Sequence, residues 1–190
     1  MPRSVREQLI LDVAGRVFAR AGYHAGSMEE IAALADVSKP MLYAYFGSKE
    51  GLYVAYIDRT GRQLLERLVG AADPSQPPRL RLRRRIEEFL AFVDEHQDGW
   101  KVLFREMAAS GPLVREVAAL RTRIVEAVGD MLHSLLSGAH ADAIAHAIVG
   151  AGESLANWWL EHPEVSRSDL ADWYDGMVQA TVWAAIRRGS

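Results

Sequence analysis

The segment DVSKPMLYAYFGSKEGLY, at residues 36–53, places basic and hydroxyl-bearing side chains within a short apolar run. Lysine can reach a DNA phosphate or a guanine edge, and tyrosine hydroxyls can donate hydrogen bonds to phosphate oxygens. A proline ring and a methionine side chain can contact a thymine methyl group. The side chains that fit these contacts are Lys39, Pro40, Met41, Tyr43 and Tyr45. We therefore expect the segment to bind double-stranded DNA; the alternative is that both tyrosines pack in a core.

Three serines in the same region occupy positions that can begin helices. Ser27 precedes Glu30 at the S-x-x-E spacing of a capping box, and Ser38 and Ser48 are further N-cap candidates. The free N–H groups and positive dipole end of each helix can hold a phosphate, and Lys49 adds a charge beside Ser48. As simple caps the serines would contribute about 1 kcal/mol each, and the two roles are compatible.

The elements that must position these side chains are two short helices joined by a tight turn, which is the sequence form of a helix-turn-helix. The second of these helices has about two turns available between Ser38 and Gly47. Leu42 and Phe46 lie four residues apart and can anchor one of its faces. Its N-terminal residues are then free to enter the major groove, which is wide enough for one helix.

Residues 18–53, FARAGYHAGSMEEIAALADVSKPMLYAYFGSKEGLY, resemble the TetR family of bacterial transcriptional regulators. The resemblance covers about the first quarter of the chain. The positions that keep the family's spacing are Gly22-Tyr23, Ile31-Ala32, Val37-Ser38, Leu42-Tyr43, Tyr45-Phe46 and Ser48-Lys49-Glu50.

Two positions depart from the family pattern. Gly26 stands where the family usually has Thr or Ser, which removes a possible phosphate contact, although Ser27 still offers a cap. Asp36 stands where the family usually has Gly. Because Asp tolerates a left-handed conformation better than most residues, we expect the turn to be intact.

The resemblance implies a homodimer whose last two helices pair with those of its partner, and an all-helical domain that binds a small-molecule effector. It also implies a palindromic DNA operator and repression that the effector relieves. It carries DNA-contacting roles over to Ser27, Ser38, Lys39, Pro40, Met41, Tyr43, Tyr45 and Lys49.

The composition limits the class of protein. The 190 residues include no cysteine, which excludes disulfides and thiolate metal sites, and the net charge of −3 does not indicate a polyanionic partner. Residues 1–50 hold six basic and six acidic side chains, so only their placement can favour DNA. Charged residues interrupt the N-terminal segment, which excludes the apolar core of a signal peptide. No apolar run reaches the roughly 18 residues of a membrane span. We expect a soluble, cytoplasmic protein without a membrane partner.

Helix-type spacing of apolar residues dominates, and no segment alternates as a half-buried strand would. The spacing predicts an all-α protein of about nine helices, with a first helix that ends at Gly22 and a proline-rich loop at 74–78. The last two helices are expected at Ala141 to about Glu161 and from Ser168 or Asp169 to about Arg188. We expect a helix-turn-helix domain at 1–47 and a ligand-binding and dimerisation domain at 48–190.

Aromatic and methionine side chains recur on the later helices. Most of them must pack in the core, but an apolar cavity with a few polar groups is the usual form of a small-molecule site. The candidates for contact with an apolar or amphipathic effector are Phe89, Phe92, Trp100, Phe104, Met107, Met131, Glu153, Asn157 and Trp158.

Small residues on one of the last two helices and large apolar residues on the other favour a dimer interface there. Small residues allow close helix approach, and large apolar ones supply the area that an obligate interface requires. The candidates are Ala147, Gly150, Ala151, Trp173, Met177 and Trp183.

The run RLRLRRR at 79–85 could bind nucleic acid. Because Glu87 and Glu88 follow it, a solvated or acid-paired helix face is the preferred interpretation. Asp142 and His146 lie four residues apart near His140, but a third ligand on the helix is missing, so no metal site is expected.

Motifs for catalysis and cofactor binding are missing. The sequence has no Walker A loop and no dinucleotide glycine pattern, and GESLA at 152–156 lacks the closing glycine of a nucleophile elbow. We therefore expect neither a cofactor nor an enzyme. The rival to a regulator is an all-helical small-molecule binding or sequestering protein whose helix-turn-helix no longer recognises an operator.

Overall fold

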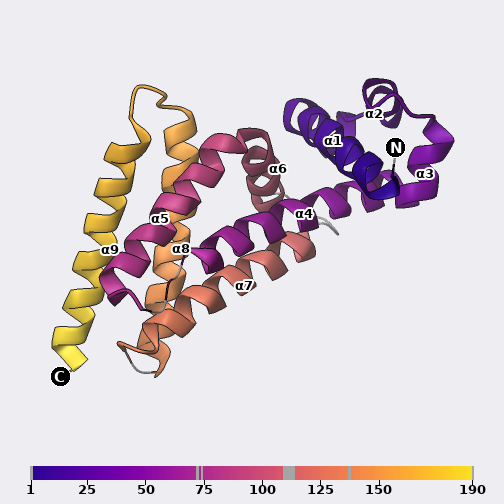
Figure 1. The fold of residues 1–190 in the computed structure, drawn as a ribbon. Helices are drawn as coiled ribbons and strands as arrows, with labels where there is room; N and C mark the ends of the chain where they lie inside the picture. Colours follow the sequence, from indigo (N-terminus) through magenta and orange to yellow (C-terminus); the bar gives the residue numbers. More distant parts are fainter. Residues whose placement is uncertain (1, 72, 74, 109–113, 137, 190) are drawn as a thin grey trace. The chain divides into compact units, whose positions relative to one another are not determined.

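The computed structural model describes residues 2–71, 73, 75–108, 114–136 and 138–189; the side chains of residues 103–108, 114, 116, 188 and 189 lie outside the description. Within these ranges the regular elements are nine α-helices (Figure 1). Their bounds are α1 Arg3–Ala25, α2 Met28–Leu34, α3 Lys39–Phe46, α4 Lys49–Gly70, α5 Pro78–Glu95, α6 Gln97–Ala108, α7 Val114–Leu132, α8 Gly138–Leu160 and α9 Arg167–Gly189. The prediction of an all-α protein with about nine helices is confirmed.

The chain forms two compact units. The first comprises Met1–Arg62 and His96–Ala119, and the second comprises Gln63–Glu95 and Leu120–Ser190. Helices α4 and α7 each contribute residues to both units, because the divisions after residues 62 and 119 fall inside them. The first unit contains the whole of segment 1–47, whose assignment as a separate DNA-binding domain stays a prediction.

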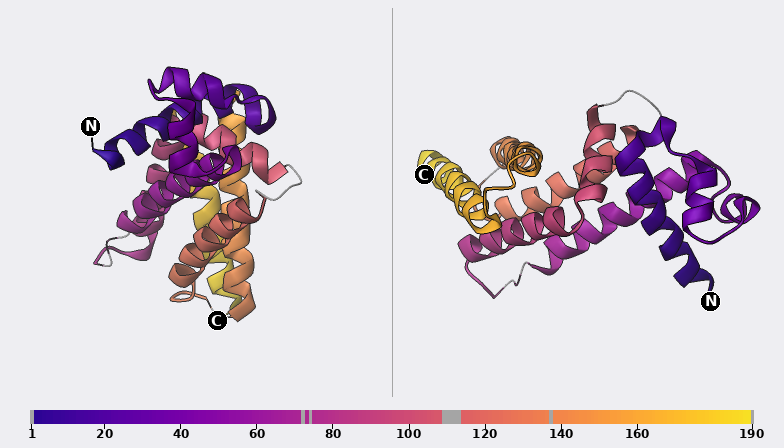
Figure 2. Two further views of the ribbon diagram at one scale, coloured as in Figure 1. Left: turned by 90° about the vertical axis from the view of Figure 1, so that its right-hand side faces the viewer. Right: turned by 90° about the horizontal axis from the view of Figure 1, so that it is seen from above.

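The core of the first unit joins α1, α2, α3 and the beginning of α4, and Figure 2 shows these helices from two further directions. Ile31 of α2 and Leu42 of α3 are fully buried. Phe18 of α1 meets Tyr53 of α4 edge to face, with ring centroids 4.7 Å apart. Such aromatic pairs contribute about 0.5 to 1.5 kcal/mol beyond their area burial, so this contact helps to fix α4 against α1.

Several helix ends differ from the predicted ones: α5 already begins at Pro78 and α8 at Gly138, and local hydrogen bonds shift the end of α1 and the start of α9. Gly22 has the expected positive φ of 75°, but the chain then makes one more turn to Ala25, with the Gly26 N–H donating to the Gly22 carbonyl at 3.0 Å. Helix α9 begins at Arg167 because Ser166 caps it. The Ser166 hydroxyl accepts from the Asp169 N–H at 3.1 Å and donates to the Asp169 carboxylate at 2.7 Å. Local hydrogen bonds therefore move both ends outward.

In the second unit α9 packs against α5 and α8. The chain turns back between α8 and α9, which run antiparallel (Figure 1). The hydroxyl of Tyr174 donates to the Ile148 carbonyl at 2.6 Å, and burial raises the pKa of that hydroxyl. A Cβ added at Gly152 would lie 2.8 Å from the same hydroxyl, so glycine permits this close contact between the two helices.

Candidate nucleic-acid interface

The turn between α2 and α3 is set by hydrogen bonds at both ends of α2. The Ser27 hydroxyl accepts from the Glu30 N–H at 3.3 Å, as the capping-box spacing predicts. At the other end, the Val37 N–H donates to the Ala32 carbonyl at 3.0 Å and the Asp36 N–H donates to the Ala33 carbonyl at 3.3 Å. This is the Schellman pattern, which requires a left-handed residue after the helix.

Asp36 supplies that left-handed residue. Its φ of 51° is the one positive value at a non-glycine position in the described ranges. The prediction that Asp replaces the family's usual glycine without loss of the turn is therefore confirmed. Aspartate is one of the few side chains that visit this region, because a short polar group can hydrogen-bond locally.

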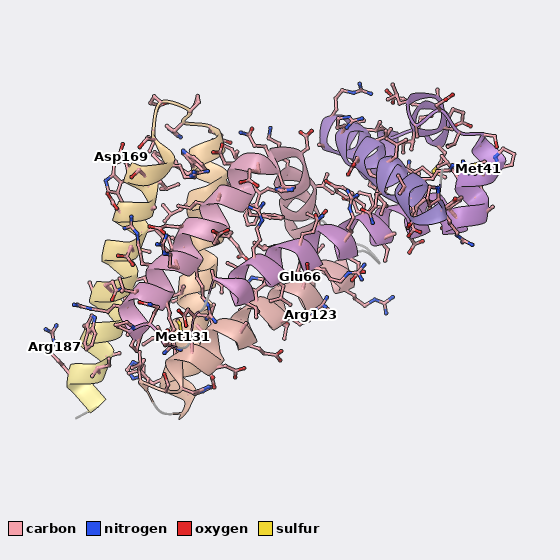
Figure 3. The ribbon with its side chains drawn as sticks, in the orientation of Figure 1. Met41, Glu66, Arg123, Met131, Asp169 and Arg187 are labelled. Carbon is pink, nitrogen blue, oxygen red and sulfur yellow. The ribbon has the colours of Figure 1, made fainter. Side chains whose placement is uncertain are left out.

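Helix α3 is held on one side and open on the other. The Ser38 hydroxyl accepts from the Met41 N–H at 3.3 Å, and the helix ends at Gly47, whose φ is 73°. Leu42 is fully buried, whereas Tyr43 is 43% exposed. Ser38, Lys39 and Pro40 are exposed, while Met41 (labelled in Figure 3), Tyr45 and Phe46 are half-buried. The structure thus brings the predicted contact residues of α3 together on one short helix.

Lys39 forms an ion pair with Glu29 of α2. The Lys39 ammonium, and after it the backbone N–H of Glu29 and the Ser27 hydroxyl, lowers the pKa of Glu29 to about 2. The same hydrogen bond raises the pKa of Lys39. Both side chains are exposed, and an exposed ion pair is worth at most about 1 kcal/mol. A DNA phosphate can therefore replace Glu29 as the partner of Lys39.

Lys49 and Ser48 lie at the N-terminus of α4. The Ser48 hydroxyl accepts from the Gly51 N–H at 2.9 Å, so Ser48 is a helix cap as expected. The Lys49 ammonium donates to the His24 carbonyl at 2.8 Å and lies 5.0 Å from the centre of the Tyr23 ring. Lys49 therefore ties the start of α4 to the end of α1.

Arg3 and Arg6 of α1 lie beside α3, although neither was a candidate from the sequence. They line a hollow of about 290 Å³ together with Ala44 and Tyr45. The Arg3 guanidinium lies 5.0 Å from the centre of the Tyr45 ring, and an Arg6 nitrogen lies 3.9 Å from the Met41 sulfur. Two arginines three residues apart are a weak signal, because only the fold brings residue 3 next to residue 45.

The effector candidates are divided between the two units. Trp100 is buried in the first unit, whereas Phe92 and Met131 are buried and Phe89 is half-buried in the second. The side chains of Phe104 and Met107 lie outside the described residues.

The α8 candidates have partners within the second unit. The Glu153 carboxylate accepts from Arg121 at 2.9 and 3.1 Å. The Asn157 side chain donates to the Glu153 backbone carbonyl at 2.7 Å. Trp158 is 39% exposed and stacks on His162, with ring centroids 4.1 Å apart, so it lies on the surface of the unit.

The dimer candidates lie mostly on exposed faces of α8 and α9. Ala147 is exposed, and Gly150 and Ala151 are half-buried. Trp173 is 57% exposed and Met177 is 44% exposed, although both are large apolar side chains. Trp183 is half-buried under the Arg79 guanidinium, which lies 4.6 Å from its ring centre. Apolar surface is therefore available on both helices.

Two family models match the chain. The model described as "Bacterial regulatory proteins, tetR family" matches residues 10–56, and "Tetracyclin repressor-like, C-terminal domain" matches residues 78–181, which is more than half of the chain. The chain belongs to the TetR family. The first match contains α2 and α3 completely, so the helix-turn-helix described above is that of a TetR-family transcriptional regulator.

Relatives extend the match along the chain. The HTH-type transcriptional activator FasR of Mycolicibacterium smegmatis is 33% identical over 182 residues, which cover 94% of this chain and 82% of FasR. A TetR-like transcriptional regulator from Rhodococcus sp. RHA1, known from a crystal structure, is 39% identical with a TM-score of 0.79, and 96% of each chain is covered. The HTH-type transcriptional repressor NicS of Pseudomonas putida is 31% identical to this chain. The aligned residues cover 63% of this chain and 57% of NicS.

The described residues lack two features of other protein classes, a membrane-spanning helix and a cluster of metal ligands. None of the described helices combines the length and the apolar character needed to cross a bilayer. The described histidine, aspartate and glutamate side chains form no group of three that could hold a metal ion. Asp142 lies 3.1 Å from the His133 imidazole, across the turn between α7 and α8.

Proposed function

We propose that this TetR-family regulator binds a palindromic DNA operator as a homodimer, through α3 in the major groove, and that an apolar or amphipathic effector lowers its affinity for the operator. The exposed face of α3 carries the proposal. Lys39, Pro40 and Tyr43 project from a helix that the fully buried Leu42 holds in place. A recognition helix needs this division between an anchored and a free face.

Phosphate contacts on both sides of α3 would set its register in the groove. Ser27 and Ser38 cap α2 and α3, and Lys39 exchanges Glu29 for a phosphate. Arg3 and Arg6 place two of the six basic side chains of residues 1–50 beside Tyr45, so the position of these charges favours DNA although their number does not.

The exposed apolar faces of α8 and α9 support the dimer. Paired with the same faces of a second chain, Trp173 and Met177 would become buried, and Ala147 and Gly150 would allow α8 to approach closely. A twofold dimer places its two recognition helices about 34 to 36 Å apart, or at a multiple of one DNA turn.

The DNA-binding part is tested by selection of fragments from the source genome on the immobilised full-length protein, followed by footprinting. One palindrome, protected at two half-sites, is the expected result. Enrichment of no discrete sequence, together with no footprint at any salt concentration, would favour the rival small-molecule binding protein.

The direction of regulation needs its own experiment, because FasR is named an activator and NicS a repressor. Our prediction is repression, as the resemblance to the family implies. In vitro transcription from a promoter that contains the selected palindrome should fall when the protein is added. An increase in transcript would make the protein an activator and leave the DNA-binding proposal intact.

A further inference from the structure

The arginine run at 79–85 in α5 divides into two kinds of side chain. Arg83 pairs with Glu87 at 2.8 Å and with Asp172 of α9 at 2.7 Å, and Arg84 pairs with Glu87 at 3.1 Å. The interpretation of the run as an acid-paired helix face is confirmed for these two. It is wrong for Arg81 and Arg85, which are half-buried and have no carboxylate within 4.0 Å among the described side chains.

Arg85 is enclosed between α5 and α7. Its Nη1 donates to the Ala127 carbonyl at 3.3 Å and to the sulfur of Met131, labelled in Figure 3, at 3.4 Å. Both acceptors are neutral. Its Nε is buried without a hydrogen-bond partner in the described structure, and the Nε of Arg81 is in the same condition. The two arginines are four residues apart, so they lie on one flank of α5.

Such an arrangement is unfavourable in the protein by itself. A buried cation requires a partner for its charge, and like charges one helical turn apart repel each other. Burial, and after it the charge of Arg81, lowers the pKa of Arg85. The last turns of α7 supply carbonyl groups worth about half a negative charge, which offsets only part of two positive charges. No described carboxylate offsets the remaining positive charge of Arg81 and Arg85 on this flank.

The same flank of α5 continues with aromatic side chains. Phe89 follows Arg85 by four residues and Phe92 follows it by seven, which places both rings on the side of α5 that carries the arginines. Phe92 is fully buried, Phe89 is half-buried, and Met131 lies beside Arg85. The flank therefore changes from cationic to apolar over about three helical turns.

We propose that this flank of α5 binds an amphipathic anion. Arg81 and Arg85 would hold its carboxylate or phosphate group, and its apolar part would lie against Phe89, Phe92 and Met131. The planar guanidinium group is suited to either anion, because it offers parallel N–H donors. This site rests on the effector of the proposed function and assigns the chemical class of that effector.

The test compares n-alkyl carboxylates and n-alkyl phosphates of about 8 to 16 carbons with primary alcohols of equal length, a size that suits a protein pocket. Binding to the full-length chain is followed by calorimetry below the micelle concentration. At least one anion should bind about tenfold or more tightly than its alcohol, since hydrogen bonds to charged groups are strong. The better of the two anions identifies the head group.

Three variants test which arginine causes the preference for anions over alcohols. Arg85→Met and Arg81→Met should bind anion and alcohol with similar affinity. The matched control Arg84→Met, whose charge pairs with Glu87 at the surface, should keep the wild-type preference. Equal binding of anions and alcohols by the wild type, binding of neither, or a preference that survives in Arg85→Met would overturn the proposal.

The Tm of Arg85→Met distinguishes a role of Arg85 in ligand binding from a purely structural role. If Arg85 binds an anion, Arg85→Met should raise the Tm of the ligand-free protein by about 2 to 4 °C, because a half-buried charge without a carboxylate partner is removed. The anion should raise the Tm of the wild type and not that of the variant. A lower Tm in Arg85→Met with the anion preference retained would instead make Arg85 a cap for α7.

Operator binding by wild type and Arg85→Met tests the proposed function and the anion site separately. An effector that releases the operator equally well from wild type and from Arg85→Met would sustain the proposed function and reject the anion site. Arg85-dependent anion binding without any change in operator affinity would sustain the site and reject its role as the effector site.

Discussion

Lys39 is the residue of α3 whose charge the proposed function uses most directly. In the free protein its ammonium is held by Glu29, yet both side chains remain exposed. The exposed pair fixes the approximate position of the ammonium without binding it so tightly that a phosphate cannot compete. Tyr43, one turn further along α3, is also exposed and offers a hydroxyl donor.

Lys39→Ala and Tyr43→Phe should weaken operator binding without unfolding the protein. Loss of one phosphate contact in each half-site should reduce the slope of log K against log salt by about 2 for the dimer. Loss of the hydroxyl should cost about 0.5 to 1.5 kcal/mol per half-site. Fluorescence anisotropy at several salt concentrations measures both effects. Lys101→Ala, an exposed lysine of α6 in the same unit, is the control and should change neither quantity.

Glu29 should titrate with a midpoint of about 2 in the wild type and at a higher pH in Lys39→Met, since Lys39 is the largest of the causes that lower its pKa. The pKa of Glu29 is lower in the folded state than in the unfolded state, so its ionised form stabilises the protein. The contribution to stability is present above the ordinary pKa of 4.5 and is lost as the pH falls through 2. NMR titration of the side-chain carboxyl carbon measures both midpoints. An unchanged midpoint in Lys39→Met would remove Lys39 as the cause.

At the scale of elements, the orientation of α3 depends on its junction with α4. A Cβ added at Gly51 would lie 2.1 Å from the carbonyl oxygen of Phe46, the last residue of α3. The clash is with backbone, so no side-chain rotation relieves it. Glycine at this position therefore allows α4 to begin directly after α3.

Gly51→Ala should lower stability by about 1 to 3 kcal/mol, as overpacking does, and should weaken operator binding because α3 must shift. Urea unfolding and anisotropy measure the two effects. Gly70→Ala, in the same helix with no atom within 4 Å of the added Cβ, is the control. It should be neutral or stabilising by up to about 1 kcal/mol, from helix propensity. Equal behaviour of the two variants would contradict the importance of the junction.

At the scale of the whole molecule, the exposed apolar residues of α9 have a defined consequence for assembly. Trp173 and Met177 lie four residues apart, so they share one face. A stable dimer buries roughly 800 Å² on each partner, and two large apolar side chains on one face supply a central part of that area.

Trp173→Glu and Met177→Glu should produce monomers, because two like charges would have to be buried near the twofold axis. Sedimentation at micromolar concentration measures the change, and the wild type should be a dimer. Val69→Glu, which places a charge at a residue of α4 that is 55% exposed, is the control and should stay dimeric. A monomeric wild type would refute the predicted assembly.

Features that depend on neighbours along the chain follow from the sequence alone. The three serine caps, the left-handed Asp36 and the order of the helices follow from hydrogen bonds and apolar spacing within a few residues. The family resemblance in residues 18–53 has the same local origin, since the spacing of the helix-turn-helix lies in one short segment.

Contacts between side chains from different helices depend on the tertiary fold. Arg3 and Arg6 reach Tyr45, and Lys39 is held by Glu29, because the folds of α1, α2 and α3 bring them together. The arginines of the run at 79–85 look equivalent in the sequence. Packing against α7 and α9 leaves Arg85 without the acidic partners that Arg83 has. The sequence gives the type of each charge, whereas burial and pairing depend on contacts between residues about 10 to 90 positions apart.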